Sequence, residues 1–172
     1  LVLMHKWEAS EALRLIEAEQ INSLSAVPMM TRELLLNPEF AEYDTSSLSS
    51  LGGGGAAMQP DLPALVDEVT EQARPAQGYG MTEVCGIITY ITGELFLERP
   101  ESCGPLVPTL KGKIVDDEGK PLPPGEPGEV CVKGLPVIKG YLNSDDATEE
   151  AITDGWLHTG DIGYFDSDGF LY

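Results

Sequence analysis

The 172-residue sequence predicts an α/β protein: part of a parallel αβα sheet subdomain, followed by a smaller β-barrel-like subdomain. Up to about residue 92, stretches with apolar residues at helical spacing alternate with short apolar segments typical of strands. Beyond that point, prolines and glycines punctuate short strand-like segments. We therefore expect an α/β subdomain over residues 1–92 and a β-rich subdomain over residues 93–172.

The first subdomain is expected to follow a regular alternation. Its elements are, in order, a buried strand (1–4), an amphipathic helix (8–20), a short strand (21–27), a helix (29–36), a polar connection (42–50), four glycines (52–55), a helix (61–69) and a strand that ends at Tyr79. Pro28 cannot continue a strand ladder, and the residue before Pro38 avoids the α region, so both prolines mark boundaries. Ligands of such sheets bind at the carboxyl ends of the strands, where we place both glycine clusters.

The second subdomain is expected to be built from short strands and turns. The predicted strands cover 113–115, 129–133, 137–141, 162–165 and 170–172, with one short helix over 147–152. The segments 117–120 and 166–169 carry turn residues and are predicted to form hairpin turns. The second of them is similar to a calcium loop, but no glutamate closes it at the twelfth position.

Charge and cysteine usage restrict the possible partners. The formal net charge is −19, from 29 acidic and 10 basic residues, so the surface repels nucleic acid and anionic membranes, and no nucleic-acid partner is expected. Polyanionic nucleotides would be repelled too, unless Mg²⁺ or added cations offset the charge. The three cysteines form no Cys-x-x-Cys pair, and neither a signal peptide nor an apolar run of about 18 residues is present. These features predict a soluble cytoplasmic protein.

The segment 78–83, Gly-Tyr-Gly-Met-Thr-Glu, holds the clearest candidate site. Its glycines let the backbone approach a ligand closely. Tyr79 offers a ring that can stack on a base, Thr82 a hydroxyl for a phosphate oxygen, and Glu83 a hard oxygen ligand for Mg²⁺. The earlier run of four glycines is not a Walker A loop, because no Gly-Lys-Ser/Thr follows it. The segment predicts a nucleoside triphosphate site.

Three stretches together resemble the core motifs of the adenylate-forming enzymes, the acyl-CoA synthetase superfamily. They are 78–83, then 128–134 with its continuation to Gly140-Tyr141, and 155–161, which reads Gly-Trp-Leu-His-Thr-Gly-Asp. The resemblance is greatest to the fatty-acid–CoA ligases. It implies that a carboxylate attacks the α-phosphate of Mg·ATP to give an acyl-adenylate, which then passes to CoA. The implied partners are therefore a carboxylic acid, ATP and CoA.

The resemblance also implies roles for individual residues. Tyr79 would pack on adenine, Thr82 would contact phosphate, Glu83 would hold Mg²⁺, and Asp161 would accept both ribose hydroxyls; Thr82 and Glu83 are the catalytic candidates. The further nucleotide-binding candidates are Gly78, Gly80, Met81 and the backbone of Gly54, Gly55, Ala56 and Ala57, where the usual Gly-Gly-Ala-Pro is replaced. A carboxylate can take two hydroxyl donors at once, which suits the role of Asp161. His158 stands beside Trp156, and we interpret it as structural.

Several alternatives remain open. An amino-acid adenylation domain or a luciferase-like enzyme would share the same chemistry, and an inactive nucleotide-binding module would share the motifs. The residues after Glu83, from Val84 to Ile88, are apolar and favour an acid with an uncharged tail. The family's lysine-bearing phosphate loop is expected upstream of Leu1, and its C-terminal domain beyond Tyr172. On that interpretation the chain alone would be inactive, and exposed strand edges would favour self-association.

Overall fold

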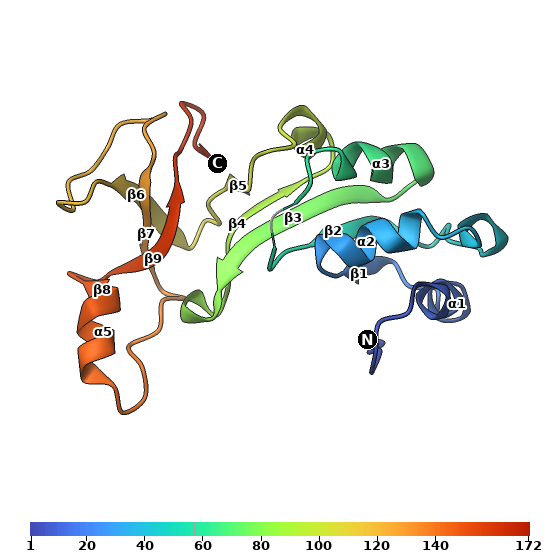
Figure 1. Cartoon of the computed structure of the whole chain (residues 1–172), viewed down its shortest axis with the longest axis horizontal. Coiled ribbons are helices and arrows are strands. Elements are labelled where there is room, and N and C mark those ends of the chain that lie inside the picture. The colour runs from blue at the N-terminus through green and yellow to red at the C-terminus, as the bar shows by residue number, and fades with distance from the viewer. Residues whose placement is uncertain (57) are drawn as a thin grey trace. The chain divides into compact units, whose positions relative to one another are not determined.

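A computed structural model describes residues 1–56 and 58–172 and confirms a mixed α/β fold (Figure 1). The chain divides into two compact units. Unit 1 comprises Leu1–Gln77 and Ile91–Glu101, and unit 2 comprises Gly78–Tyr90 and Ser102–Tyr172. Among the described residues, no helix has the length and apolar character needed to cross a membrane.

A four-stranded sheet with the order β1-β2-β3-β4 runs through the first part of the chain. Its strands are β1 (Ser23–Ser25), β2 (Ser50–Gly53), β3 (Arg74–Met81) and β4 (Gly86–Thr92). β2 pairs in parallel with β1 on one side and with β3 on the other. Parallel neighbours need a crossover connection, and here helices supply it, as the alternating sequence pattern predicts.

The helices of unit 1 begin and end where local sequence dictates. They are α1 (Ala9–Glu19), α2 (Pro28–Leu35), α3 (Leu62–Val69) and α4 (Glu94–Glu98), with a 3₁₀ turn, η1, at Phe40–Glu42. The Glu8 side chain caps α1 by accepting from the backbone N–H of Ser10. Pro28 opens α2 and Pro63 lies in the first turn of α3, where a missing N–H costs nothing.

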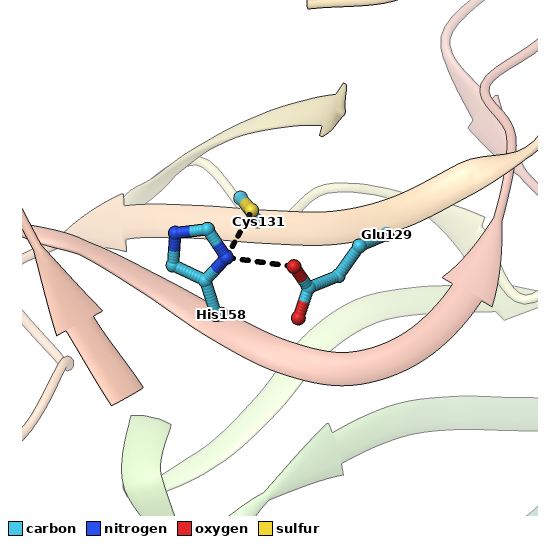
Figure 2. A group of neighbouring side chains, drawn as sticks. All are labelled: Glu129, Cys131 and His158. Atoms are coloured by element: carbon cyan, nitrogen blue, oxygen red, sulfur yellow. Dashed lines mark hydrogen bonds and ion pairs between the residues drawn. The ribbon is translucent and has the colours of Figure 1, made fainter. Parts of the chain in front are cut away.

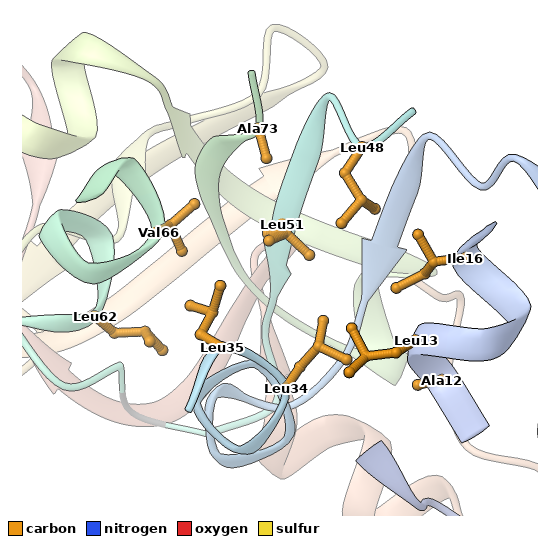
Figure 3. Close-up of a cluster of buried hydrophobic side chains, with 10 residues drawn as sticks. All are labelled: Ala12, Leu13, Ile16, Leu34, Leu35, Leu48, Leu51, Leu62, Val66 and Ala73. Carbon is orange, nitrogen blue, oxygen red and sulfur yellow. The ribbon is translucent and has the colours of Figure 1, made fainter. Parts of the chain in front are cut away.

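The core of unit 1 lies between these helices and the sheet. It contains Ala12, Leu13, Ile16, Leu34, Leu35, Leu48, Leu51, Leu62, Val66 and Ala73. Figure 3 shows Leu51 of β2 at its centre, with side chains from the helices converging on it. Fully burying one leucine side chain contributes about 1.5–3 kcal/mol, so this cluster stabilises the packing of the helices on the sheet.

Unit 2 is dominated by antiparallel pairing. A four-stranded sheet has the order β6-β7-β9-β8, and β5 pairs with β10. The bounds are β5 (Gly104–Pro105), β6 (Leu110–Val115), β7 (Gly128–Gly134), β8 (Ile152–Thr153), β9 (Trp156–Gly163), β10 (Phe170–Leu171) and helix α5 (Asp145–Ala151). Its core includes Val84, Ile88, Val130, Val132 and Leu157.

Some sequence-based expectations were wrong. Residues 1–4 form no strand, and Leu1 and Leu3 are exposed, because an apolar run becomes a strand only when it finds a pairing partner. Residues 137–141 form an irregular segment rather than a strand, and Tyr141 makes an isolated bridge with Ser144. Strand β4 and helix α4 were not predicted. The predicted hairpin turn at 166–169 is confirmed: Asp166 Oδ1 accepts from the backbone N–H of Asp168 and of Phe170.

Candidate functional site

The segment 78–83 forms the end of β3 and the start of a 3₁₀ turn, η2 (Thr82–Val84), in unit 2. The chain reverses there, with Cys85 in the left-handed region at φ 55°, and continues as β4. A Cβ on Gly80 would overlap the carbonyl oxygen of Gly86, so this position needs glycine for the reversal itself. The side chain of Thr82 is exposed and that of Glu83 is half-buried.

Tyr79 and Asp161 meet although 82 positions separate them. Tyr79 Oη donates to Asp161 Oδ2 at 2.6 Å, which joins β3 to β9. Burial of the ring, and then the hydrogen bond to Asp161, raise the pKa of the Tyr79 phenol above its usual value. The phenol is therefore a neutral donor at physiological pH, and it orients an exposed carboxylate beside a half-buried aromatic ring.

Asp161 lies on an irregular part of β9. Cys131 of β7 pairs with His158, and Glu129 pairs with Ile162. Between these pairs one residue of β7, Val130, faces three residues of β9, 159–161. β9 therefore bulges at Asp161, and bulges commonly re-aim a side chain beside a functional site.

Glu83 is held by a tyrosine that sequence reasoning gave no role. Tyr141 Oη donates to Glu83 Oε1 at 2.9 Å, and the Ile138 N–H donates to the Glu83 carbonyl. The hydrogen bond to the Glu83 carboxylate raises the pKa of the Tyr141 phenol. Glu83 Oε2 takes no hydrogen bond from the residues that the structure describes. The Gly-Tyr pair at 140–141 was the available signal, because it continues the second motif.

The glycine run divides into two parts with different surroundings. Gly52 and Gly53 belong to β2, where an added Cβ would overlap the carbonyl oxygens of Ala76 and Ala26, respectively. Two of the four glycines therefore belong to a strand. Gly54, Gly55 and Ala56 follow the strand in unit 1, and Gly55 has open space around its Cβ position. Ala57 lies outside the described residues.

His158, which we interpreted as structural, belongs to a polar cluster in unit 2. Its Nδ1 lies 2.7 Å from Glu129 Oε2 and 3.5 Å from Cys131 Sγ (Figure 2). Cys131 is fully buried, and burial raises the pKa of its thiol to about 11. In the described part of the chain this is the one group of three His, Cys, Asp or Glu side chains spaced closely enough for a metal.

A family profile for AMP-binding enzymes matches residues 1–142, which is most of the chain. The chain belongs to the AMP-binding enzyme family. The matched residues include the motifs at 78–83 and 128–134, whose resemblance to adenylate-forming enzymes predicted this family.

Curated AMP-binding relatives match over the full chain. 4-Coumarate–CoA ligase 1 of Glycine max is 38% identical over 177 residues, and the match covers 100% of this chain and 60% of that protein. The medium/long-chain-fatty-acid–CoA ligase FadD8 of Mycobacterium tuberculosis is 39% identical, with 100% of this chain and 30% of that protein covered. The chain thus spans less than two thirds of the length of these relatives.

Solved structures of AMP-binding enzymes share the fold. The amide bond synthetase McbA of Marinactinospora thermotolerans aligns with a TM-score of 0.89 and 30% identity over 98% of this chain and 34% of that one. The N-terminal domain of FACL13 from Mycobacterium tuberculosis aligns with a TM-score of 0.88 and 32% identity over 98% of this chain and 42% of that one.

Proposed function

We propose that the chain forms part of an ATP-dependent acyl-CoA ligase, which activates a carboxylic acid as an acyl-adenylate and transfers the acyl group to CoA. The observation that carries this proposal is the 2.6 Å hydrogen bond from Tyr79 Oη to Asp161 Oδ2. This bond joins an aromatic ring, which can stack on a base, to a carboxylate, which can accept from a diol. A nucleoside carries its base and its ribose diol a few ångströms apart.

In this proposal Tyr79 stacks on adenine and Asp161 accepts the two ribose hydroxyls. Tyr79 is half-buried, so its ring is held in place before a ligand arrives. Asp161 is exposed, and a carboxylate has about four lone-pair positions. One hydrogen bond to Tyr79 therefore leaves room for two hydroxyl donors. Gly78, Gly80 and Met81 belong to the same segment and are proposed to contact the nucleotide through their backbone.

Glu83 and Thr82 are proposed to serve the phosphate end of ATP. Mg²⁺ prefers one or two carboxylate oxygens and keeps several waters. Glu83 fits this preference, because Tyr141 fixes its Oε1 while Oε2 faces no hydrogen-bond donor within the described residues. Bound Mg²⁺ would offset phosphate charge in a protein whose formal net charge is −19. Thr82, exposed beside Glu83, would donate its hydroxyl to a phosphate oxygen.

The acid is proposed to have an uncharged tail, with a fatty acid as the first candidate. The apolar stretch after Glu83 supports this less than its composition suggested, because Val84 and Ile88 are buried in the core of unit 2. Ile87 remains 49% exposed and could contact a ligand. The relatives named for fatty acids and for 4-coumarate both act on acids of this kind.

Acid-dependent ATP–pyrophosphate exchange tests the proposal. The full-length protein should exchange pyrophosphate when fatty or cinnamic acids are added, and release AMP and a thioester when CoA follows. Glu83→Gln should melt near wild type and lose most of the exchange, whereas the exposed Glu118→Gln should retain it. Exchange without any acid, or normal exchange by Glu83→Gln, would contradict the proposal. Amide formation with an added amine, but no thioester with CoA, would instead indicate an activity like that of McbA.

A further inference from the structure

Glu129 bridges two groups on the neighbouring strand β9. Its Oε1 accepts a hydrogen bond from the Gly160 N–H at 3.1 Å, and its Oε2 lies 2.7 Å from His158 Nδ1. The side chains of Glu129 and His158 are 29% and 28% exposed, so water screens this pair only in part. Both oxygens of one carboxylate are thus used to hold the segment that leads into Asp161.

The bulge in β9 explains why a side chain is needed there. Because Val130 alone faces residues 159–161, the bulge lacks regular ladder partners for its backbone groups. Side chains supply the bonds instead. Glu129 accepts from Gly160, whose φ is +74°, and Thr159 Oγ1 accepts from the Asp161 N–H at 3.2 Å while its own hydroxyl donates to the Val130 carbonyl at 2.8 Å.

His158 fixes the orientation of Glu129. An ionised carboxylate can only accept hydrogen bonds, so Nδ1 of His158 carries a hydrogen and donates a hydrogen bond to Glu129 Oε2. His158 pairs directly with Cys131 in the ladder, and the Cys131 sulfur lies 3.5 Å from the same nitrogen. Figure 2 shows Nδ1 between the sulfur and the carboxylate oxygen.

We propose that Glu129, oriented by His158, is a positioning residue that fixes the bulge carrying Asp161 and thereby sets the affinity for the ribose diol. This inference rests on the proposed function, in which Asp161 accepts the two ribose hydroxyls. Glu129 acts through the Gly160 backbone and does not touch the nucleotide. Without it, the Asp161 carboxylate remains, but the backbone that aims it loses one of its side-chain supports.

A metal bound by Glu129, Cys131 and His158 is the competing explanation of the cluster. Two ligand atoms of a tetrahedral zinc site, each about 2.0–2.2 Å from the ion, would lie roughly 3.3 Å or more from each other. The 2.7 Å between His158 Nδ1 and Glu129 Oε2 is a hydrogen-bond distance instead. Glu129 Oε1 is also already engaged by Gly160. The geometry therefore favours a hydrogen-bonded cluster.

Equilibrium binding of ATP and of 2′,3′-dideoxy-ATP to the full-length protein isolates the contribution of the diol, because the two ligands share base and phosphates. Wild type should prefer ATP by roughly tenfold or more, since the diol donates to a charged acceptor. In Glu129→Ala the preference for ATP should fall to about twofold. In Glu129→Gln the preference should fall by a factor of about three, because an amide oxygen accepts more weakly than a carboxylate. Affinity for the dideoxy ligand should stay unchanged in each.

The controls separate this inference from the proposed function. Glu126→Gln, in the exposed turn before β7, should keep the full preference. If wild type and Asp161→Ala show the same preference, the ribose contact itself is wrong. If Asp161→Ala abolishes the preference while a normally melting Glu129→Gln retains all of it, the ribose contact stands and the positioning role is overturned. One equivalent of zinc in the purified protein, lost on Cys131→Ser, would also overturn it. Where Glu129→Ala fails to fold, Glu129→Gln decides.

Discussion

The two units use glycine and polar side chains for different purposes. In unit 1, Gly52 and Gly53 let three strands approach one another, and the surrounding core is aliphatic. In unit 2, an apolar core is accompanied by two separate side-chain hydrogen bonds, one from Tyr79 to Asp161 and one from Tyr141 to Glu83. The proposed chemistry is concentrated in the unit whose strands are joined by side chains as well as by backbone ladders.

The largest expected effect concerns the packing of unit 1. Gly52→Ala should destabilise the protein by about 3 kcal/mol, because the new methyl group would overlap the Ala76 carbonyl oxygen. Gly55→Ala is the matched control. Among the described residues, no atom beyond its chain neighbours lies within 4 Å of its Cβ position, and its φ of +79° opposes the change at about 1 kcal/mol. Denaturant unfolding measures both, and equal losses would remove the structural distinction within the glycine run.

Substitution of Asp161 should affect ligand binding rather than stability. Asp161→Ala should weaken ATP binding by roughly tenfold or more, because a charged acceptor is lost, while the exposed carboxylate contributes little to folding. Calorimetric titration with Mg·ATP measures the affinity, and a thermal melt checks the fold. Asp117→Ala, in an exposed turn of the same unit, is the control. An unchanged affinity would show that the polar contacts of unit 2 serve the fold alone.

A smaller effect is expected at Tyr141. Tyr141→Phe removes the hydrogen bond to Glu83 Oε1 but leaves the carboxylate, so the KM for Mg·ATP should rise about threefold. Tyr164→Phe is a suitable control, because the Tyr164 ring stacks on Tyr172 at 5.2 Å and lies on a different part of unit 2. A larger rise in KM for Tyr164→Phe than for Tyr141→Phe would contradict the proposed role of Tyr141 in holding Glu83.

The smallest expected effect concerns the three thiols of unit 2, which should differ in their reactivity. Exposed Cys85 should react first with a thiol reagent, then Cys103, and Cys131 last, because burial raises the pKa of the latter two. The Cys131 thiol has a pKa of about 11 in the folded protein, whereas the ordinary pKa of a cysteine thiol is 9.0. Above pH 9 the unfolded state therefore loses this proton first, so stability should fall between pH 9 and pH 11. Cys131→Ser should remove that part of the fall.

Local sequence was sufficient for helices α1, α2 and α3, but not for the short helix α4. The apolar periodicity of α1 and α3 and the proline in the first turn of α3 act within a few residues, so the sequence predicts both helices directly. Motif resemblance identified Tyr79 and Asp161, which the structure brings into contact. The glycines of β2 could not be assigned in this way, because the crowding comes from Ala76 of β3 and from Ala26, which follows β1.

Pairing between distant strands was the part that sequence could not supply. The bulge in β9 depends on the register between two strands about 30 residues apart, and its one local signal is Gly160 within the strand. The contacts of Glu129 with His158 and Gly160 follow from that register, and so they were missed. The strand expected at 137–141 was wrong for a related reason: within the described residues, the one pairing of this segment is an isolated bridge between Tyr141 and Ser144.

The irregular segment of β9 also has a consequence for the timing of local motion. The amides of Gly160 and Asp161 are bonded to side-chain oxygens, whereas those deeper in β7 and β9 belong to regular pairings. When the side chains of Glu129 and Thr159 release these bonds, the amides of Gly160 and Asp161 become exposed to solvent while the sheet stays intact. Amide hydrogen exchange should therefore proceed in two stages, with Gly160 and Asp161 ahead of Leu157. In Glu129→Ala, Gly160 should exchange faster still while Leu157 keeps its wild-type rate.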